Sequence, residues 1–313
     1  MTRASEQAAA RRIVLAYSSG LVDTDAVPWL AEHHDAEVVA LTLDFGQGRE
    51  LEAFRDQALA AGAVRAHVLD VADAFANHFV LPALRAGVLY ADGRPMMSGL
   101  ERALLAQKLV EIAAIEQTTT VAHGCSSGDR RVATSAQTLN ANISVIALPA
   151  EIVGSADCHM RPLAASRAER SSEPAYVELT FVSGAPTAVN GIPMPLGGLI
   201  DTLNMLASAH GVGGVHPFET PAAVVLNAAH QSLIDDGAGN ETEWRSIGRA
   251  YADIIDRGEW FAEARNALNA TIESLQRSVA GTVQLKLFNG ACEIVEKKPP
   301  HDGKLLKIAE TKG

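Results

Sequence analysis

The chain has 313 residues, of which 48% are hydrophobic, so it is long enough to bury a large core and to divide into two lobes. Its formal net charge of -11 repels phosphate backbones and therefore argues against a nucleic-acid partner. No window approaches the roughly 18 uninterrupted apolar residues of a membrane span, so we expect no membrane insertion and a cytoplasmic protein.

The first 12 residues combine arginines with alanines and have no apolar segment of signal-peptide length, so we expect a frayed leader there. Short apolar runs then alternate with helical stretches, which is the pattern of a parallel β-sheet covered by helices on both faces. The predicted strands lie at residues 13–17, 37–43, 66–69, 119–122 and 144–148.

The turn after the first predicted strand is the most informative segment. Residues 12–25 read Arg-Ile-Val-Leu-Ala-Tyr-Ser-Ser-Gly-Leu-Val-Asp-Thr-Asp, an apolar run followed by small residues that open a helix. Small residues let backbone N–H groups approach an anion, and the helix adds the positive end of its dipole. The pattern indicates a phosphate site, although an ordinary strand-to-helix turn is the alternative because no Walker lysine follows. Turns at 44–48 and 123–128 follow two other strands, and we expect all three to converge on one crevice.

Between residues 151 and 174 the periodic pattern fades, and a new one begins with a strand at 176–181. We therefore expect two domains, at residues 1–165 and 166–313. The second domain contains a helix at 196–209 and ends in a hairpin whose Asn289-Gly290 turn is a strong signal. Two apolar helical stripes between them indicate core or subunit contacts rather than ligand sites. The stripes are Trp244, Ile247, Tyr251 and Ile254, and Phe261, Ala264, Leu268, Ile272 and Leu275.

The phosphate loop resembles the Ala-Tyr-Ser-Gly-Gly-Leu-Asp-Thr-Ser loop of the argininosuccinate synthase family, an ATP-pyrophosphatase loop. Further segments resemble that family in the same order over most of the chain. The chain is therefore identified as a divergent and shortened member. These segments lie at 39–48, 81–90, 108–113, 121–125, 219–221, 227–230 and 281–288.

The resemblance implies an α/β fold with a parallel-sheet nucleotide-binding domain, adenine nucleotide alpha-hydrolase-like, and a second, smaller α+β domain. It also implies an AMP-forming ligase, in which ATP activates an oxygen with release of pyrophosphate and an amine then displaces AMP. We expect ATP and Mg2+ as cofactors and no metal site built by protein side chains. The expected partners are an amino-acid-like small molecule and further copies of the chain, in a dimer or a tetramer.

By resemblance, the ATP site combines the first strand and its turn with residues near the nucleoside. The ATP-binding candidates are Ala16, Tyr17, Ser18, Ser19, Gly20, Asp23, Thr24, Thr42, Leu43 and Gly124. In the ungapped match Ser19 replaces a family glycine and Val22 replaces the loop aspartate, while Asp23 and Thr24 come one residue late. Either a one-residue slip still delivers Asp23 to the nucleotide or the loop is damaged. We favour the slip, because Asp-Thr also starts a helix well, and take Asp23 and Ser18 as catalytic candidates.

The substrate side departs further from the family. The substrate-binding candidates are Arg94, Ser98, Gly99, Arg102, Ser126, Asp129, Arg130 and Phe218. Arg94 stands where the family has a tyrosine that contacts citrulline, and Ala133 stands where it has a citrulline-binding arginine. Segments that carry the citrulline-binding serines and a citrulline-binding glutamate are missing. Because a buried ammonium would lose its carboxylate partner, we expect a substrate other than citrulline, with aspartate as a candidate amine.

Other residues with reactive side chains can be explained without a catalytic role. The family fills the positions of His123 and Cys125 in the same way, so we favour structural roles over a general base or a nucleophile. The three cysteines lie far apart and indicate neither a disulfide framework nor a zinc cluster. Arg94, Arg102, Arg130 and Arg131 together bind an anion, or the last two are a solvated surface pair. The alternatives to a ligase are a catalytically silent paralogue that binds or regulates a partner, and sulfur transfer through Cys125.

Overall fold

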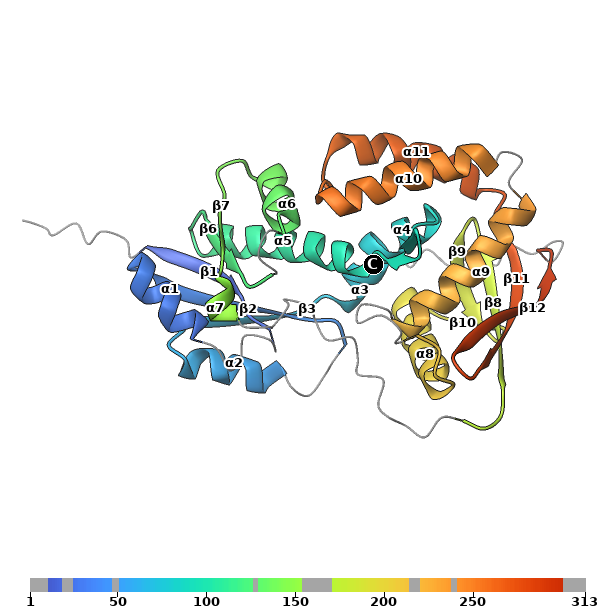
Figure 1. Cartoon of the computed structure of the whole chain (residues 1–313), viewed down its shortest axis with the longest axis horizontal. Helices are drawn as coiled ribbons and strands as arrows, with labels where there is room; N and C mark the ends of the chain where they lie inside the picture. The colour runs from blue at the N-terminus through green and yellow to red at the C-terminus, as the bar shows by residue number, and fades with distance from the viewer. Residues whose placement is uncertain are drawn as a thin grey trace, which may run out of the picture.

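The computed structural model describes residues 11–18, 25–46, 51–125, 129–153, 171–213, 220–237 and 241–300. In these residues the chain forms two lobes, each built on a five-stranded sheet, and helix α5 (Met97–Ile115) extends from the first lobe toward the second (Figure 1). The expected domain boundary after residue 165 lies outside the described residues. Within the described ranges, no helix combines the length and the apolar character that crossing a membrane requires.

The first lobe contains an all-parallel sheet with the strand order β3-β2-β1-β6-β7. Its strands are β1 (Arg12–Ala16), β2 (Glu37–Asp44), β3 (Arg65–Asp70), β6 (Thr120–His123) and β7 (Ser144–Ala147). All five predicted strands are confirmed, with ends within one residue, because apolar runs with both faces covered favour parallel strands. β1 pairs with both β2 and β6, so the segments after these three strands begin side by side at one edge.

Alternate residues of β1 pack against different layers of helices. Ile13 and Leu15 lie in a small core with α1 (Ala26–His34), α2 (Leu51–Ala60) and α7 (Ala150–Val153). Val14 and Ala16 face the opposite side and join a much larger core with α5 and α6 (Arg131–Leu139). The sheet is therefore covered on both faces, as the sequence predicts.

The second lobe contains an antiparallel sheet with the order β10-β9-β8-β11-β12. Its elements are β8 (Ala175–Val182), β9 (Ala185–Val189), β10 (Ile192–Pro193), α8 (Leu196–Ala209), α9 (Pro221–Gly237), β11 (Gly281–Phe288) and β12 (Ala291–Lys298). The predicted helix and hairpin are both confirmed. The backbone φ angles of Asn289 and Gly290 are 49° and 83°, the left-handed conformation that the hairpin turn requires.

A run of short elements between β3 and α5 was not anticipated from the sequence. It comprises α3 (Ala72–Phe75), the π-helical turn η1 (Ala76–Val80), α4 (Leu81–Arg85), β4 (Tyr90–Ala91) and β5 (Arg94–Pro95). Its apolar side chains, such as Phe79 and Leu84, belong to the large core. This run therefore fills the space between the two sheets.

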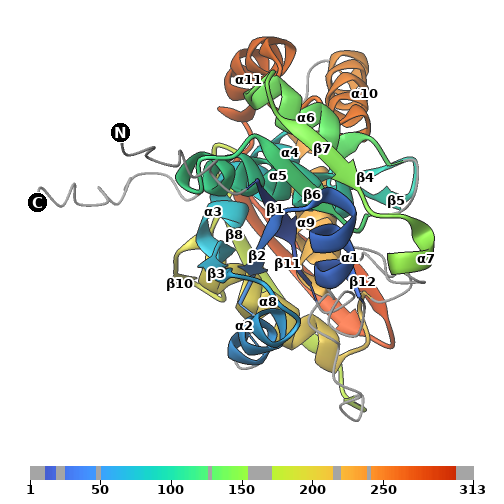
Figure 2. The ribbon, with the colours of Figure 1, turned by 90° about the vertical axis from the view of Figure 1, so that its left-hand side faces the viewer.

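Two C-terminal helices return to the first lobe. Helices α10 (Glu241–Arg257) and α11 (Glu263–Gln276) lie on the α5 and α6 side, and α10 contacts both of those helices (Figures 1 and 2). The predicted stripe of α10 is buried in the core, with Tyr251 fully inaccessible. Trp260, only 2% exposed, stacks on Phe79 at 5.3 Å between ring centroids. One continuous apolar core therefore joins the two lobes.

A buried charge network holds the opposite, amino end of the first sheet. Glu116, 2% exposed, lies 3.1 Å from Arg12 Nη1, 2.6 Å from Arg65 Nη1 and 2.8 Å from His67 Nε2. Burial alone would raise the pKa of Glu116, but hydrogen bonds from His67 and Arg65 outweigh it and lower the pKa. Since Arg12 and Arg65 begin β1 and β3, one carboxylate ties the end of α5 to two strands.

The contact between α5 and α10 gives a first prediction. A Cβ atom on Gly99, the third residue of α5, would overlap the Ile255 side chain of α10. Gly99→Ala should therefore lower the free energy of unfolding by about 1–3 kcal/mol, as overpacking does. Gly198, the third residue of α8, has no atom within 4 Å of an added Cβ, so Gly198→Ala should be neutral or stabilise by up to about 1 kcal/mol. Urea denaturation measures both, and equal stabilities of the two variants would contradict the close packing.

Candidate nucleotide and substrate site

The carboxyl edge of the first sheet brings the described ATP-binding candidates together. The Tyr17 amide donates to the Leu41 carbonyl at 2.8 Å, and the Thr42 hydroxyl donates to the Tyr17 carbonyl at 3.0 Å. Thr42 thus fixes the first residue after β1. The candidates on β1, β2 and β6 and just beyond them are Ala16, Tyr17, Ser18, Thr42, Leu43 and Gly124. Ser19, Gly20, Asp23 and Thr24 lie outside the described residues.

Ser18 presents a polar atom with no protein partner. Its Oγ is buried and has no hydrogen-bond partner among the described residues. A buried hydroxyl normally finds a partner, because leaving one unpaired costs about 1–3 kcal/mol. The hydroxyl lies where the ends of β1, β2 and β6 meet, which is where α/β sheets bind their ligands. A phosphate oxygen at this edge would supply the missing partner.

His123 and Cys125 have structural surroundings. His123 is 1% exposed, and its Nδ1 accepts a hydrogen bond from the Cys125 amide at 3.2 Å. Burial lowers the pKa of His123 to about 4, with Asp129 opposing and Arg102 adding to the shift. The ring is therefore neutral at pH 7 with Nδ1 already engaged. Cys125 is disulfide-bonded, which differs from the sequence expectation and leaves no free thiol for sulfur transfer.

Asp129 is held between two arginines. Its carboxylate lies 2.5 Å from Arg102 Nε, and it accepts bonds from Arg131 Nε at 3.0 Å and Arg131 Nη2 at 2.8 Å. The side chains of Arg102 and Asp129 are 4% and 8% exposed. Burial would raise the pKa of Asp129, but the hydrogen bonds from Arg131 and the charge of Arg102 outweigh it and lower the pKa. This ion pair joins α5 to the segment before α6.

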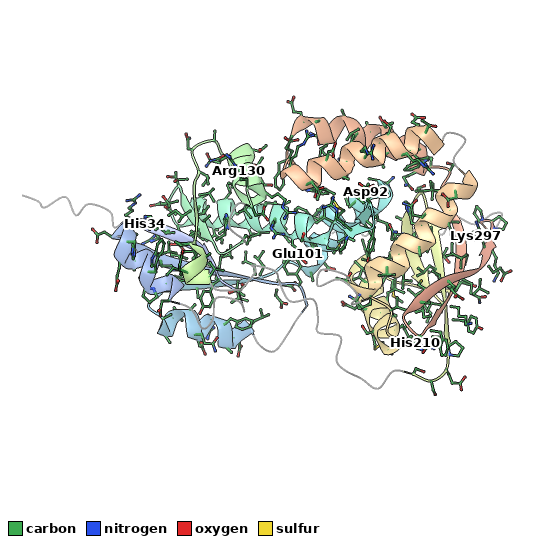
Figure 3. All side chains as sticks on the ribbon, in the orientation of Figure 1. His34, Asp92, Glu101, Arg130, His210 and Lys297 are labelled. Carbon is green, nitrogen blue, oxygen red and sulfur yellow. The ribbon has the colours of Figure 1, made fainter. Side chains whose placement is uncertain are left out.

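The other substrate-binding candidates are distributed differently. Gly99 packs against α10, and the Ser98 carbonyl accepts a bond from Arg102 Nη1 at 3.1 Å. Arg130 is exposed on the first lobe (Figure 3). Arg94 pairs with Asp256 of α10 at 3.1 Å and lines a separate cavity of about 1040 Å³. Ser126 and Phe218 lie outside the described residues.

The four arginines considered from the sequence therefore do not form one cluster. Arg102 and Arg131 both bind Asp129, whereas Arg94 faces α10 and Arg130 faces solvent. Asp129 offsets part of the charge of these two arginines. An anion would meet arginines that already have a carboxylate partner.

Glu101 was missed by the sequence analysis. It lies on α5 one turn after Met97 and lines a cavity between the two lobes, where Figure 3 labels it. Burial raises the pKa of Glu101 to about 8, and the charge of Arg102 opposes the shift. The only sequence signal is a carboxylate one helical turn from Met97, on a face that the helix otherwise buries.

The parallel sheet and the candidate site at its carboxyl edge define a nucleotide-binding α/β protein with a smaller C-terminal domain. Residues 12–161 match the family model described as "Arginosuccinate synthase N-terminal HUP domain", and residues 157–306 match the "Arginosuccinate synthase C-terminal domain". The argininosuccinate synthases of Bacillus thuringiensis (strain Al Hakam) and Bacillus cereus (strain 03BB102) are each 33% identical, covering 92% of this chain and 87% of the relative. The chain belongs to the argininosuccinate synthase family.

Removing the negative charge of Asp129 should destabilise the folded protein. Asp129→Asn leaves the buried Arg102 without its counter-ion, so we expect a loss of about 3 kcal/mol in the free energy of unfolding at pH 7. Asp256→Asn, which breaks the exposed pair with Arg94, should change stability by less than about 1 kcal/mol. Chemical denaturation of both variants measures the difference.

The stability difference between wild type and Asp129→Asn should depend on pH. A carboxylate whose pKa is lowered in the folded state stabilises the protein above its unfolded pKa, and this contribution is lost as pH falls through the folded pKa. The gap between wild type and Asp129→Asn should therefore narrow in acid. A gap that stays constant down to the acid limit of folding would contradict the assigned ion pair.

Proposed function

We propose that the chain is an AMP-forming carbon–nitrogen ligase. A substrate oxygen attacks the α-phosphorus of ATP, the bond to the β-phosphate oxygen breaks, and pyrophosphate leaves. The nitrogen of an amine then attacks the activated carbon, the carbon–oxygen bond to AMP breaks, and the nitrogen releases a proton to solvent or a base. Family membership supports this reaction class.

The single observation that supports an ATP site most directly is the unpartnered Ser18 hydroxyl at the carboxyl edge. Ser18 would donate to a phosphate oxygen, while Ala16, Tyr17 and the Thr42 anchor fix the strand end from which the loop departs. Gly124 would leave space beside the nucleoside. Asp23 remains a proposed catalytic residue on the basis of the sequence.

Mg2+ is part of the proposal as a charge partner of the phosphates. In the described ranges no three potential ligands gather to form a metal site. We expect the ion to be held chiefly by phosphate oxygens and water. When bound, it would stabilise the negative charge of the leaving pyrophosphate.

The acceptor substrate is proposed to differ from citrulline. The matched stretch spans 351 positions, more than the 313 residues of this chain, so the relatives carry segments that this chain lacks. Arg94, which replaces the family tyrosine, pairs with Asp256. Asp129, which stands near the family's substrate loop, is held by Arg102 and Arg131. An amino-acid-like acceptor with a different polar end fits these changes better.

The oligomeric state, the domain boundary and the cellular location are also proposals. Tyr176, Val182 and Val295 are half exposed on the second sheet, which is consistent with a homo-oligomer. We propose that the domains divide near residue 165 and that the enzyme works in the cytoplasm. Size-exclusion chromatography with light scattering distinguishes a monomer from a dimer or a tetramer.

Ser18→Ala tests the ATP site. Because the hydroxyl has no hydrogen-bond partner among the described residues, its removal should leave the melting temperature unchanged or slightly higher. The affinity for ATP with Mg2+, measured by calorimetry, should fall about tenfold, the value of one hydrogen bond to a charged group. Ser135→Ala is the reciprocal control, because Ser135 Oγ donates to the Gly258 carbonyl at 2.7 Å and should affect stability but not ATP affinity.

Turnover separates the ligase from a silent paralogue. Pyrophosphate release should require ATP, an oxygen acceptor and an amine, and should be tested with ureido and carboxylate acceptors and with aspartate among the amines. If the wild-type protein shows no ATP binding at millimolar concentration, the proposed function fails. If it binds ATP but releases no pyrophosphate with any acceptor, the silent paralogue is favoured instead.

A further inference from the structure

A cavity of about 240 Å³ lies between the two lobes and is separate from the Arg94 cavity. Its walls come from Phe45 just after β2 and Asp70 at the end of β3, from α3, η1 and the start of α5, from one side of α8 along its length, and from the start of α9. Pockets at domain junctions are common ligand sites, and a cavity of this size suits a small molecule. The described ATP-binding candidates are not among the residues that line this cavity.

The described wall of the cavity is acidic. Among the residues that the structure describes, four carboxylates and no lysine, arginine or histidine line it, and three of the four carboxylates are at exposed positions. The carboxylates are Asp70, Asp73, Glu101 and Asp201. The N-termini of α8 and α9 add partial positive charge, of about half a unit each, which offsets only part of this charge. The remaining field favours a cation.

Glu101 is the least exposed of the four carboxylates. It makes no hydrogen bond and no ion pair with any described residue, although it faces the cavity. Asp70, by contrast, accepts a bond from the Ala72 amide at 3.1 Å. The adjacent Arg102 is directed to Asp129 at 2.5 Å, so it does not neutralise Glu101 at contact distance. Burial, which raises the pKa of Glu101 to about 8, favours the neutral acid near pH 7, and a cation bound beside the group would favour the charged form.

Most of the other described wall residues are apolar, with Asn204, Ser208 and Thr220 as polar exceptions. Phe45 and Phe75 meet edge to face at 4.9 Å between centroids, and Ile200 and Leu226 lie on the side of the second lobe. Asn204 is already engaged, since its Oδ1 accepts the Ala222 amide at 2.9 Å. The cavity therefore offers an ionisable carboxyl group at Glu101 and a hydrocarbon surface beside it.

The chemistry favours an organic cation over a metal ion. No set of three carboxylate or histidine groups in the described ranges converges closely enough to hold a metal. Carboxylates spread along the wall match the charged end of an organic cation, and the apolar side chains match its hydrocarbon chain. We propose that this cavity binds a small alkylammonium or alkylguanidinium group, with Glu101 as its counter-ion, and that this group belongs to the amine substrate. The last step rests on the proposed ligase function, whereas cation binding itself does not.

Binding to the protein without ATP tests the proposal. n-Butylammonium, n-butylguanidinium and the neutral n-butanol are titrated into the full chain at pH 9 and followed by ligand-observed NMR. Either cation should bind at least tenfold more tightly than the alcohol. Glu101→Gln should abolish this preference. Glu111→Gln is the control on the same helix, because Glu111 is exposed and pairs with Lys108 at 2.7 Å, and it should behave as wild type.

pH provides a second readout. The groups that face Glu101 are Arg102 on its own helix and Asp70, Asp73 and Asp201 across the cavity. As pH falls through about 8 the Glu101 carboxylate takes up a proton, so the preference for the cation should weaken toward pH 6 in wild type only. Asp201→Asn, at an exposed position, should reduce the preference two- to threefold and serves if Glu101→Gln does not fold.

The outcomes are distinct. Equal binding of cations and alcohol by wild type, or an unchanged preference in Glu101→Gln, overturns the cation site. Either result leaves pyrophosphate release as an independent test of the ligase. A cation preference that Mg2+ alone removes at equimolar concentration would also overturn the proposal, because it would mark a metal site.

Discussion

The geometry of the candidate site depends on the buried ion pair of Arg102 with Asp129. Arg102 comes from the second turn of the long helix α5, and Asp129 precedes α6, so the pair fixes the helix that packs on the sheet relative to the segment that follows β6. In a buried setting such a pair is stable only when its geometry and its other hydrogen bonds are complete. Arg131 completes it with two further bonds to the same carboxylate.

That arrangement is reinforced from the other end of the chain. The Ser135 hydroxyl of α6 donates to the Gly258 carbonyl after α10, and Gly258 approaches the Arg131 backbone so closely that an added Cβ would lie 2.5 Å from its carbonyl oxygen. The C-terminal helices thus support the same loop that carries Asp129. Since one apolar core runs through both lobes, the second lobe is part of the support of the nucleotide edge.

The sequence predicted those strands, turns and helices whose formation depends mainly on neighbouring residues. The apolar runs of β1 and β2, the Asn289-Gly290 turn and helix α8 follow from periodicity and turn preference, which act over a few residues. The π-helical turn at 76–80 and the return of α10 onto α5 depend on packing between distant segments, so no local pattern indicates them.

The site residues divide in the same way. Ser18 and Thr42 were found because they adjoin strands with clear signals and match a family motif. The ion pairing of Arg94 with Asp256, 162 residues away, and the exposure of Glu101 to a cavity formed by the second lobe are long-range facts. Composition and spacing carry no information on such pairs.

The Glu116 network has an effect beyond its own stability. It secures the amino ends of β1 and β3 through side chains that are remote from the carboxyl edge, where ligands of such sheets bind. The amino edge therefore holds the strands together without using any residue of the ligand edge. Loops at the carboxyl edge can change during evolution without loss of this anchor.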